Sequence, residues 1–148
     1  MEEGNEVTII DNFERPNDDI DFQNMILKDN VKHISIDMTI SSSFDNLPLN
    51  YYDEVYHFAA LNGTSNFYNY PARVLKVGVY STINLLDWIS SQEKKPSIIY
   101  TSSSETYSGT AELLGSKFEI PTPENIPLSV DDVSNVRWSY GASKLIGE

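Results

Sequence analysis

Short apolar runs, separated by helix-like segments, constrain the fold of this chain more than any other feature. Four such runs read as strands, at residues 7–10, 32–37, 53–58 and 97–100. Strands that alternate with helices indicate βαβ units and a parallel sheet. The expected fold class is therefore α/β. Ligands of such sheets bind beyond the carboxyl ends of the strands, which is where this chain places several of its polar residues.

The helical segments differ in how clearly they can be read. Residues 17–28 are compatible with a short helix, and Pro71 suits the first turn of a longer one. Five apolar residues follow Pro71 at helical spacing and form a predicted core-facing stripe: Leu75, Val79, Ile83, Leu86 and Ile89. Residues 109–137 contain three prolines and no clean period, which predicts a long loop. A last helix is expected from Tyr140.

Composition excludes several classes of protein. The chain has 148 residues, enough for one domain, and a formal net charge of −12, which disfavours nucleic acids and anionic membranes as partners. No apolar run approaches the ~20 residues that cross a bilayer, and the N-terminus does not resemble a signal peptide; a cytoplasmic location is expected. Cysteine is absent, and His33 and His57 are far apart in sequence, so no metal site is predicted.

Tyr140 and Lys144 form the clearest chemical motif. Residues i and i+4 share one face of a helix, so both side chains can point into the same cleft. A tyrosine titrates near ~10, and a neighbouring positive charge lowers that pKa toward the range of a general base. A hydroxyl cluster, Thr101 to Ser104, lies upstream. The alternative is a purely structural role, in which Tyr140 and Lys144 lie on a solvated helix face with the aromatic ring packed beneath it.

Four stretches around these residues, 3–12, 55–60, 98–107 and 139–148, together resemble the extended short-chain dehydrogenase/reductase superfamily. The likeness is to its NAD-dependent sugar epimerase/dehydratase branch, and the stretches occur in the family's order. The resemblance implies a Rossmann-like, doubly wound parallel sheet. It also implies that residues 1–148 form a partial NAD-binding domain with no second domain.

The resemblance implies NAD as cofactor and assigns its contacts to residues at strand ends and on the last helix: Asp11, Asn12, Asp37, Phe58, Ala59, Ala60, Thr101, Tyr140 and Lys144. A carboxylate at Asp11 would accept hydrogen bonds from a ribose diol and would repel the extra phosphate of NADP. Asp37 would lie beside the adenine. A turn or helix-capping role is the alternative for both aspartates.

The resemblance also implies four catalytic residues. Ser103 would hold the sugar oxygen while Tyr140 removes or returns the proton, and Lys144 would bond the nicotinamide ribose and keep Tyr140 acidic. Glu105 matches a carboxylate that assists elimination in the dehydratases and decarboxylases, and so favours those reactions over simple epimerisation. A solvated glutamate is the alternative. The substrate of the parent family is a nucleotide-sugar.

The chain departs from the family pattern in three places. It lacks the first strand and the G-x-x-G-x-x-G turn, it lacks the C-terminal substrate-binding part, and it has Gly78 where the family often has Asn. The strands on either side of the missing one would pair directly, take a strand from another polypeptide, or leave the chain marginally stable. A complementing chain is therefore one expected partner. The resemblance implies a homodimer as another, formed through the helix that follows Pro71 and the helix that carries Tyr140 and Lys144.

These departures leave two readings of function. The first is a partial NAD-dependent nucleotide-sugar epimerase or dehydratase, which alone would have little NAD affinity and no turnover. The second is a non-catalytic Rossmann-like interaction or regulatory protein. The retention of Ser103, Tyr140 and Lys144 favours the first reading.

Overall fold

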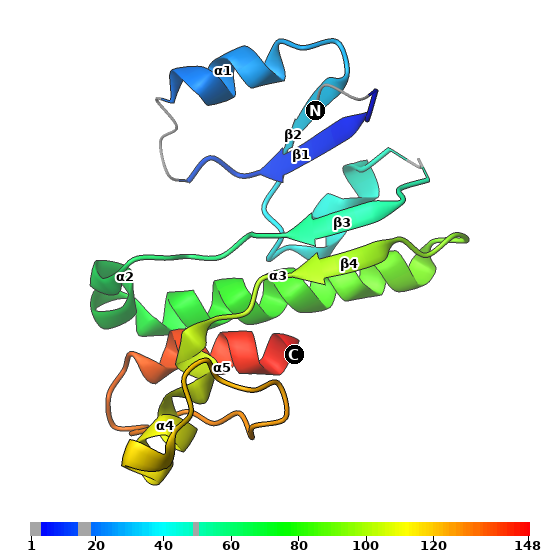
Figure 1. The fold of residues 1–148 in the computed structure, drawn as a ribbon. Coiled ribbons are helices and arrows are strands. Elements are labelled where there is room, and N and C mark those ends of the chain that lie inside the picture. Colours follow the sequence, from blue (N-terminus) through cyan, green and yellow to red (C-terminus); the bar gives the residue numbers. More distant parts are fainter. Residues whose placement is uncertain (1–3, 15–18, 49–50) are drawn as a thin grey trace. The chain divides into compact units, whose positions relative to one another are not determined.

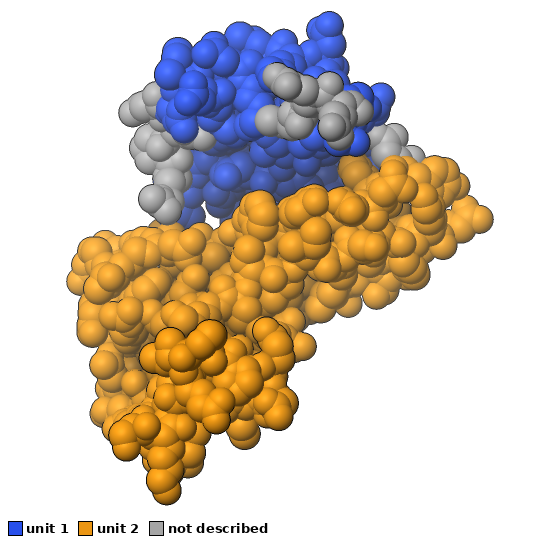
Figure 2. All heavy atoms as spheres, viewed as in Figure 1, with its two compact units in different colours: residues 1–49 blue, residues 50–148 orange. Residues whose placement is uncertain are grey.

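A computed structural model describes residues 4–14, 19–48 and 51–148. The chain divides into two compact units, residues 1–49 and residues 50–148, which Figure 2 colours separately. None of the helices among the described residues is long and apolar enough to span a membrane.

The first unit is a parallel strand pair with one helix. It contains β1 (Val7–Asp11), α1 (Ile20–Ile26), β2 (Val31–Ser35) and the 3₁₀ helix η1 (Ser41–Asn46) (Figure 1). The strands pair in register from Val7 opposite Val31 to Asp11 opposite Ser35. Asp19 caps α1 by accepting a hydrogen bond from the Asp21 amide at 2.9 Å. Both predicted strands and the predicted short helix are confirmed, although residues 17 and 18 lie outside the described part of the chain.

The second unit combines a parallel strand pair with four α-helices and two 3₁₀ helices. Its elements, in chain order, are β3 (Glu54–His57), α2 (Thr64–Asn69), α3 (Pro71–Ser91), β4 (Ser97–Tyr100), η2 (Ser104–Tyr107), α4 (Ser108–Leu114), η3 (Gly115–Lys117) and α5 (Trp138–Gly147). The strands pair from Glu54 opposite Ser97 to His57 opposite Tyr100. Helix α5 packs along α3 (Figure 1). The predicted strands and the start of α3 at Pro71 are confirmed.

The predicted core-facing stripe of α3 is wrong. Ile83 and Leu86 are 43% and 44% exposed, and Ile89 is the one member of the stripe that is buried. The buried face instead consists of Val74, Gly78, Ser81, Thr82, Leu85 and Ile89. Three of these residues are small or polar. A pattern of large apolar residues therefore does not find this face.

Gly78 explains why α3 and α5 lie so close together. A Cβ atom at this position would lie 2.5 Å from Ser143 Oγ and 2.6 Å from Ser143 Cβ. The missing side chain thus lets the two helices meet at Gly78 and Ser143. The close contact with Ser143 leaves no room for a side chain at position 78, where the family often has Asn.

The predicted loop over residues 109–137 is partly wrong. Helix α4 and η3 occupy its first part, and irregular chain follows from Phe118. The three prolines all lie in that later part, so they do not argue against a helix in the residues before it. Helix α5 begins at Trp138, two residues before the predicted start.

The predicted fold class is confirmed as a parallel, Rossmann-like α/β arrangement with an incomplete sheet. Among the described residues, β1 pairs with β2 alone and β3 pairs with β4 alone.

Candidate functional site

The carboxyl end of the β3–β4 sheet gathers most of the predicted site residues. Phe58, Ala59 and Ala60 follow β3, and Thr101 follows β4. Thr101 is fastened to the end of β3, because its amide and its Oγ1 both donate to the His57 carbonyl, at 3.4 and 3.0 Å. Phe58 is 61% exposed.

Ser103 is placed by the first turn of η2. Its Oγ accepts a hydrogen bond from the Glu105 amide at 3.2 Å and so caps this turn. Its carbonyl accepts from the amide and Oγ1 of Thr106, at 3.1 and 2.7 Å. The Ser103 hydroxyl also lies near enough to the phenol of Tyr140 to lower the pKa of that phenol. The structure therefore brings the two predicted catalytic hydroxyls together.

Tyr140 lies on α5 against the core of the second unit. Its ring stacks on the buried Phe67 ring, with centroids 4.6 Å apart and planes 20° from parallel. Burial raises the pKa of Tyr140, and the nearby Glu105 carboxylate raises it further, while the neighbouring Ser103 hydroxyl opposes them. The expectation of a lowered pKa is wrong for this arrangement.

Lys144 shares a helix face with Tyr140 but does not point its ammonium at the phenol. Its Nζ donates to the Thr101 carbonyl at 2.7 Å and lies 5.9 Å from the centroid of the Tyr140 ring. The side chain is buried, and this burial lowers the pKa of Lys144. Lys144 therefore ties α5 to the end of β4.

His57 is a buried neighbour that the sequence did not assign to the site. Its Nε2 lies 2.9 Å from Thr82 Oγ1, and that hydroxyl donates to the Gly78 carbonyl at 2.8 Å. Because the Thr82 hydroxyl uses its proton in this bond, it must accept from His57, and we assign the ring proton of His57 to Nε2. Burial, followed by the charge of Lys144, lowers the pKa of His57 to about 4. Among the described residues there is no group of three carboxylates or histidines that could hold a metal ion.

Glu105 forms an ion pair with Arg137, the residue just before α5. Nη2 and Nε of Arg137 lie 2.6 and 3.1 Å from the same Glu105 oxygen, Oε1. The Glu105 side chain is 22% exposed, so it is not a freely solvated carboxylate. The sequence analysis did not assign Arg137 to the site. The one signal that could have found it is a basic residue one turn before Tyr140.

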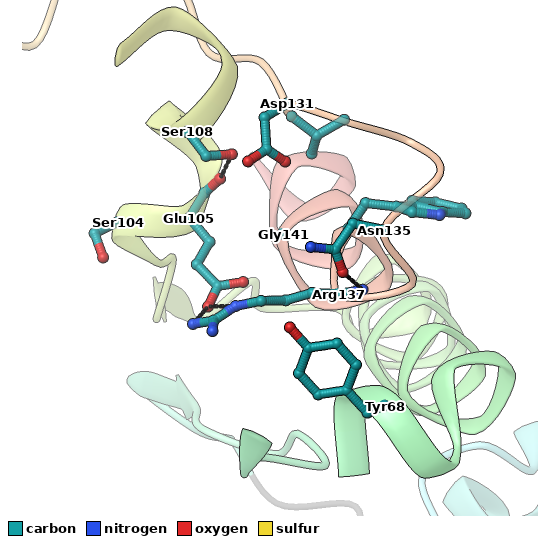
Figure 3. A pocket seen from close by; sticks show the side chains of 10 residues that line it. Tyr68, Ser104, Glu105, Ser108, Asp131, Asn135, Arg137 and Gly141 are labelled. Carbon is teal, nitrogen blue, oxygen red and sulfur yellow. Dashed lines mark hydrogen bonds and ion pairs between the residues drawn. The ribbon is translucent and has the colours of Figure 1, made fainter. Parts of the chain in front are cut away.

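A cavity of about 400 Å³ opens beside this ion pair (Figure 3). Its wall comes from α2, η2, α4, the start of α5 and the segment before it: Tyr68, Ser104, Glu105, Ser108, Val130, Asp131, Asn135, Arg137, Trp138 and Gly141. The wall thus includes the chain neighbours of Ser103 and Tyr140 and is mostly polar, which suits a ligand rich in hydroxyl groups.

The predicted adenosine contacts lie in the first unit, at the carboxyl end of its sheet. Asp11 ends β1 and is exposed, and its Oδ1 accepts from the Phe13 amide at 2.7 Å. Asn12 accepts in the same way from the Glu14 amide at 3.1 Å. Oδ1 of Asp37, after β2, accepts from the amide and Oγ1 of Thr39, both at 2.8 Å. Each side chain therefore also stabilises a turn.

Comparison with known proteins decides the family. A model of the NAD dependent epimerase/dehydratase family matches residues 1–148. The chain belongs to this family. The resemblance to extended short-chain dehydrogenases/reductases is thereby confirmed. A comparison with curated proteins found no match.

Several solved members of this family share the fold. The chain is 25% identical to a UDP-galactose 4-epimerase, with a TM-score of 0.71, and the match covers 98% of this chain and 41% of that one. It is 26% identical to the UDP-glucose 4-epimerase of Bifidobacterium longum, solved with NAD+ and UDP, with a TM-score of 0.73 and coverage of 97% and 40%. An NDP-hexosamine 5,6-dehydratase at 22% identity and a TM-score of 0.64 shares the fold over 95% of this chain and 38% of its own. The chain thus spans about two fifths of the length of these relatives.

Proposed function

We propose that this chain carries the proton-transfer residues of an NAD-dependent nucleotide-sugar epimerase or dehydratase. The closeness of Ser103 to Tyr140, with Lys144 one turn along α5, is the observation that carries the proposal. Similarity to the UDP-galactose and UDP-glucose 4-epimerases supports a nucleotide-sugar substrate.

Each unit, taken by itself, has a residue that suits part of NAD. In the second unit Lys144 supplies an ammonium for a ribose hydroxyl, and in the first unit Asp11 supplies an exposed carboxylate that suits a ribose diol. Among the described residues, the Ser102 hydroxyl is buried beside this end of β4 without a hydrogen-bond partner, which a polar ligand would satisfy. NAD, when bound, supplies the hydride acceptor.

Ser103 and Tyr140 would share the proton chemistry. The Ser103 hydroxyl would hold the oxygen of the reacting sugar carbon, and Tyr140 would exchange a proton with that oxygen. Because burial and Glu105 raise its pKa, Tyr140 holds its proton near neutral pH and is set up as a donor. To act as a base it must lose that proton, which requires the Lys144 ammonium to approach the phenol.

One observation favours the non-catalytic alternative. Lys144 is bonded to Thr101, and the pKa of Tyr140 is raised rather than lowered. A Rossmann-like interaction protein could retain this arrangement for packing alone. Cofactor binding separates the two functions, because only the enzyme requires Lys144 to reach a ribose.

The test is calorimetric titration of NAD into the chain, alone and with the family's first strand, glycine-rich turn and helix fused to its N-terminus. We expect binding by the fusion. Lys144→Met should weaken it about 10- to 100-fold, the effect of losing a charge-assisted hydrogen bond of ~1.5–3 kcal/mol. Lys117→Met removes an exposed lysine of η3 and should change nothing. Absence of NAD binding by a fusion that is folded by circular dichroism would favour the non-catalytic function.

A further inference from the structure

We propose that Arg137 is a positioning residue of this site, which anchors the Glu105 carboxylate as an anion on the wall of the cavity beside Tyr140. The contacts in Figure 3 carry this inference. Its chemical consequence rests on the proposed function. The anchoring itself does not.

Arg137 is placed to act as a clamp between elements. Its carbonyl accepts a hydrogen bond from the Tyr140 amide at 3.2 Å, so its backbone begins the helix that carries the phenol. Its guanidinium reaches across to η2 and donates twice to Glu105 Oε1. The same group lies 5.9 Å from the centroid of the Phe67 ring and close to Tyr68, both on α2. One side chain thus contacts η2 and α2 from the start of α5.

Phe67 lies in contact with both the Arg137 guanidinium and the Tyr140 ring. The guanidinium lies over this ring, and the ring stacks on Tyr140. Glu105 is close enough to Tyr140 for its charge to raise the pKa of the phenol. The ion pair therefore holds a negative charge on the cavity wall, near enough to act on Tyr140.

The other charged and titratable groups around Tyr140 do not replace this effect. Lys144 on α5 donates to Thr101, and the Tyr100 phenol on β4 interacts weakly with Tyr140. Two further titratable groups line the cavity wall: Tyr68 and Asp131. Of the anionic groups, Glu105 is the one whose charge acts on Tyr140.

An anchored anion defines what Glu105 can do. It can accept a hydrogen bond from a substrate hydroxyl in the cavity, since a carboxylate has several acceptor positions. It can also take a proton from a substrate carbon beside a keto group, which elimination requires. The anchoring therefore positions Glu105 for either epimerisation or elimination.

The test measures whether Glu105 stays beside Tyr140. The chain is labelled with ¹³Cζ-tyrosine, and the Tyr140 signal among its nine tyrosines is assigned from its loss in Tyr140→Phe. The titration midpoint of that signal is measured in wild type, Glu105→Gln, Arg137→Met and the double variant. Removing the carboxylate charge should lower the midpoint by roughly 0.2–0.7 pH units, the size expected for a partly exposed pair.

The inference predicts that this lowering depends on Arg137. For a fixed geometry, the effect of one charge on Tyr140 is independent of the other charges, so Glu105→Gln would act equally in both backgrounds. If Arg137 anchors Glu105, the lowering should fall to less than half in Arg137→Met, and Arg137→Lys should restore most of it. Equal lowering in both backgrounds, or none in wild type, overturns the inference. Lys117→Met is the control for a lost positive charge and should leave the midpoint unchanged.

A second measurement covers the case in which Arg137→Met does not fold. At neutral pH the Arg137 Nε–H signal should be visible in ¹⁵N spectra of wild type, because this group donates to Glu105, and should be lost in Glu105→Gln. A signal unaffected by Glu105→Gln contradicts the anchoring. Neither measurement uses NAD or substrate, so the inference can fail while NAD binding succeeds, and the reverse.

Discussion

Replacing Gly78 with alanine tests the close contact between α3 and α5. The added Cβ would lie 2.6 Å from Ser143 Cβ, well inside the ~3.5 Å at which carbon atoms pack. Rotating the serine hydroxyl cannot relieve this, because the Cβ atom does not move with it. The helices must separate, and overpacking of this kind costs ~1–3 kcal/mol. Alanine in a helix regains ~1 kcal/mol over glycine, so we expect a net destabilisation of up to about 2 kcal/mol.

The matched control is the same substitution with room made for it. In a Ser143→Gly background the steric cost disappears, and Gly78→Ala should stabilise the chain by up to ~1 kcal/mol through helix propensity. Urea unfolding followed by tryptophan fluorescence reports on this unit, because Trp88 lies on α3 and Trp138 on α5. If Gly78→Ala has the same effect in both backgrounds, the contact with Ser143 does not set the distance between the helices.

Three further results are expected. The pKa of His57 falls from 6.5 in the unfolded state to about 4 in the folded state, so the unfolded state binds more protons between these values. Acidification from pH 6.5 to pH 4 should therefore lower the free energy of unfolding by about 3 kcal/mol, as measured by urea unfolding at each pH. The His57→Gln variant should lose less stability over the same range. Lys144→Met should raise the pKa of His57 by up to about one unit, followed by NMR, since the ammonium disfavours a second positive charge; an unchanged pKa would contradict that coupling. Phe67→Ala should lower the free energy of unfolding by ~3–5 kcal/mol and move the pKa of Tyr140 down toward its ordinary value. Phe67→Leu should have a smaller effect on both quantities. If the titration midpoint of Tyr140 does not change in either variant, burial under the Phe67 ring does not raise the pKa of Tyr140.

The strands and the start of α3 could be predicted because their signals are local. A β-branched run such as residues 7–10 reads as a buried parallel strand, and Pro71 marks a helix start by its own geometry. The buried face of α3 could not be predicted in this way. Gly78 is buried because Ser143 of α5 lies against it, and Thr82 contacts His57 at the end of β3. No local property of these residues says so.

The site shows the same division. The spacing of Tyr140 and Lys144 correctly predicts that they share a helix face, and the hydroxyl cluster correctly points to the end of β4. The direction of the Lys144 ammonium depends on the Thr101 carbonyl, and the raised pKa of Tyr140 depends on burial and on Glu105. These are tertiary contacts between distant segments. The pairing of Arg137 with Glu105 is of this kind too, which explains why Arg137 was missed.

The bond from Lys144 to the Thr101 carbonyl makes ligand binding and local stability share one group. An ammonium has three donors, so Lys144 can bond a ligand while it keeps the Thr101 carbonyl, and that backbone bond fixes where the ammonium stands. The same bond means that loss of binding in a Lys144 variant has two sources, a missing contact to the ligand and a loosened helix. Stability and affinity must therefore be measured on the same variant before either is assigned to this lysine.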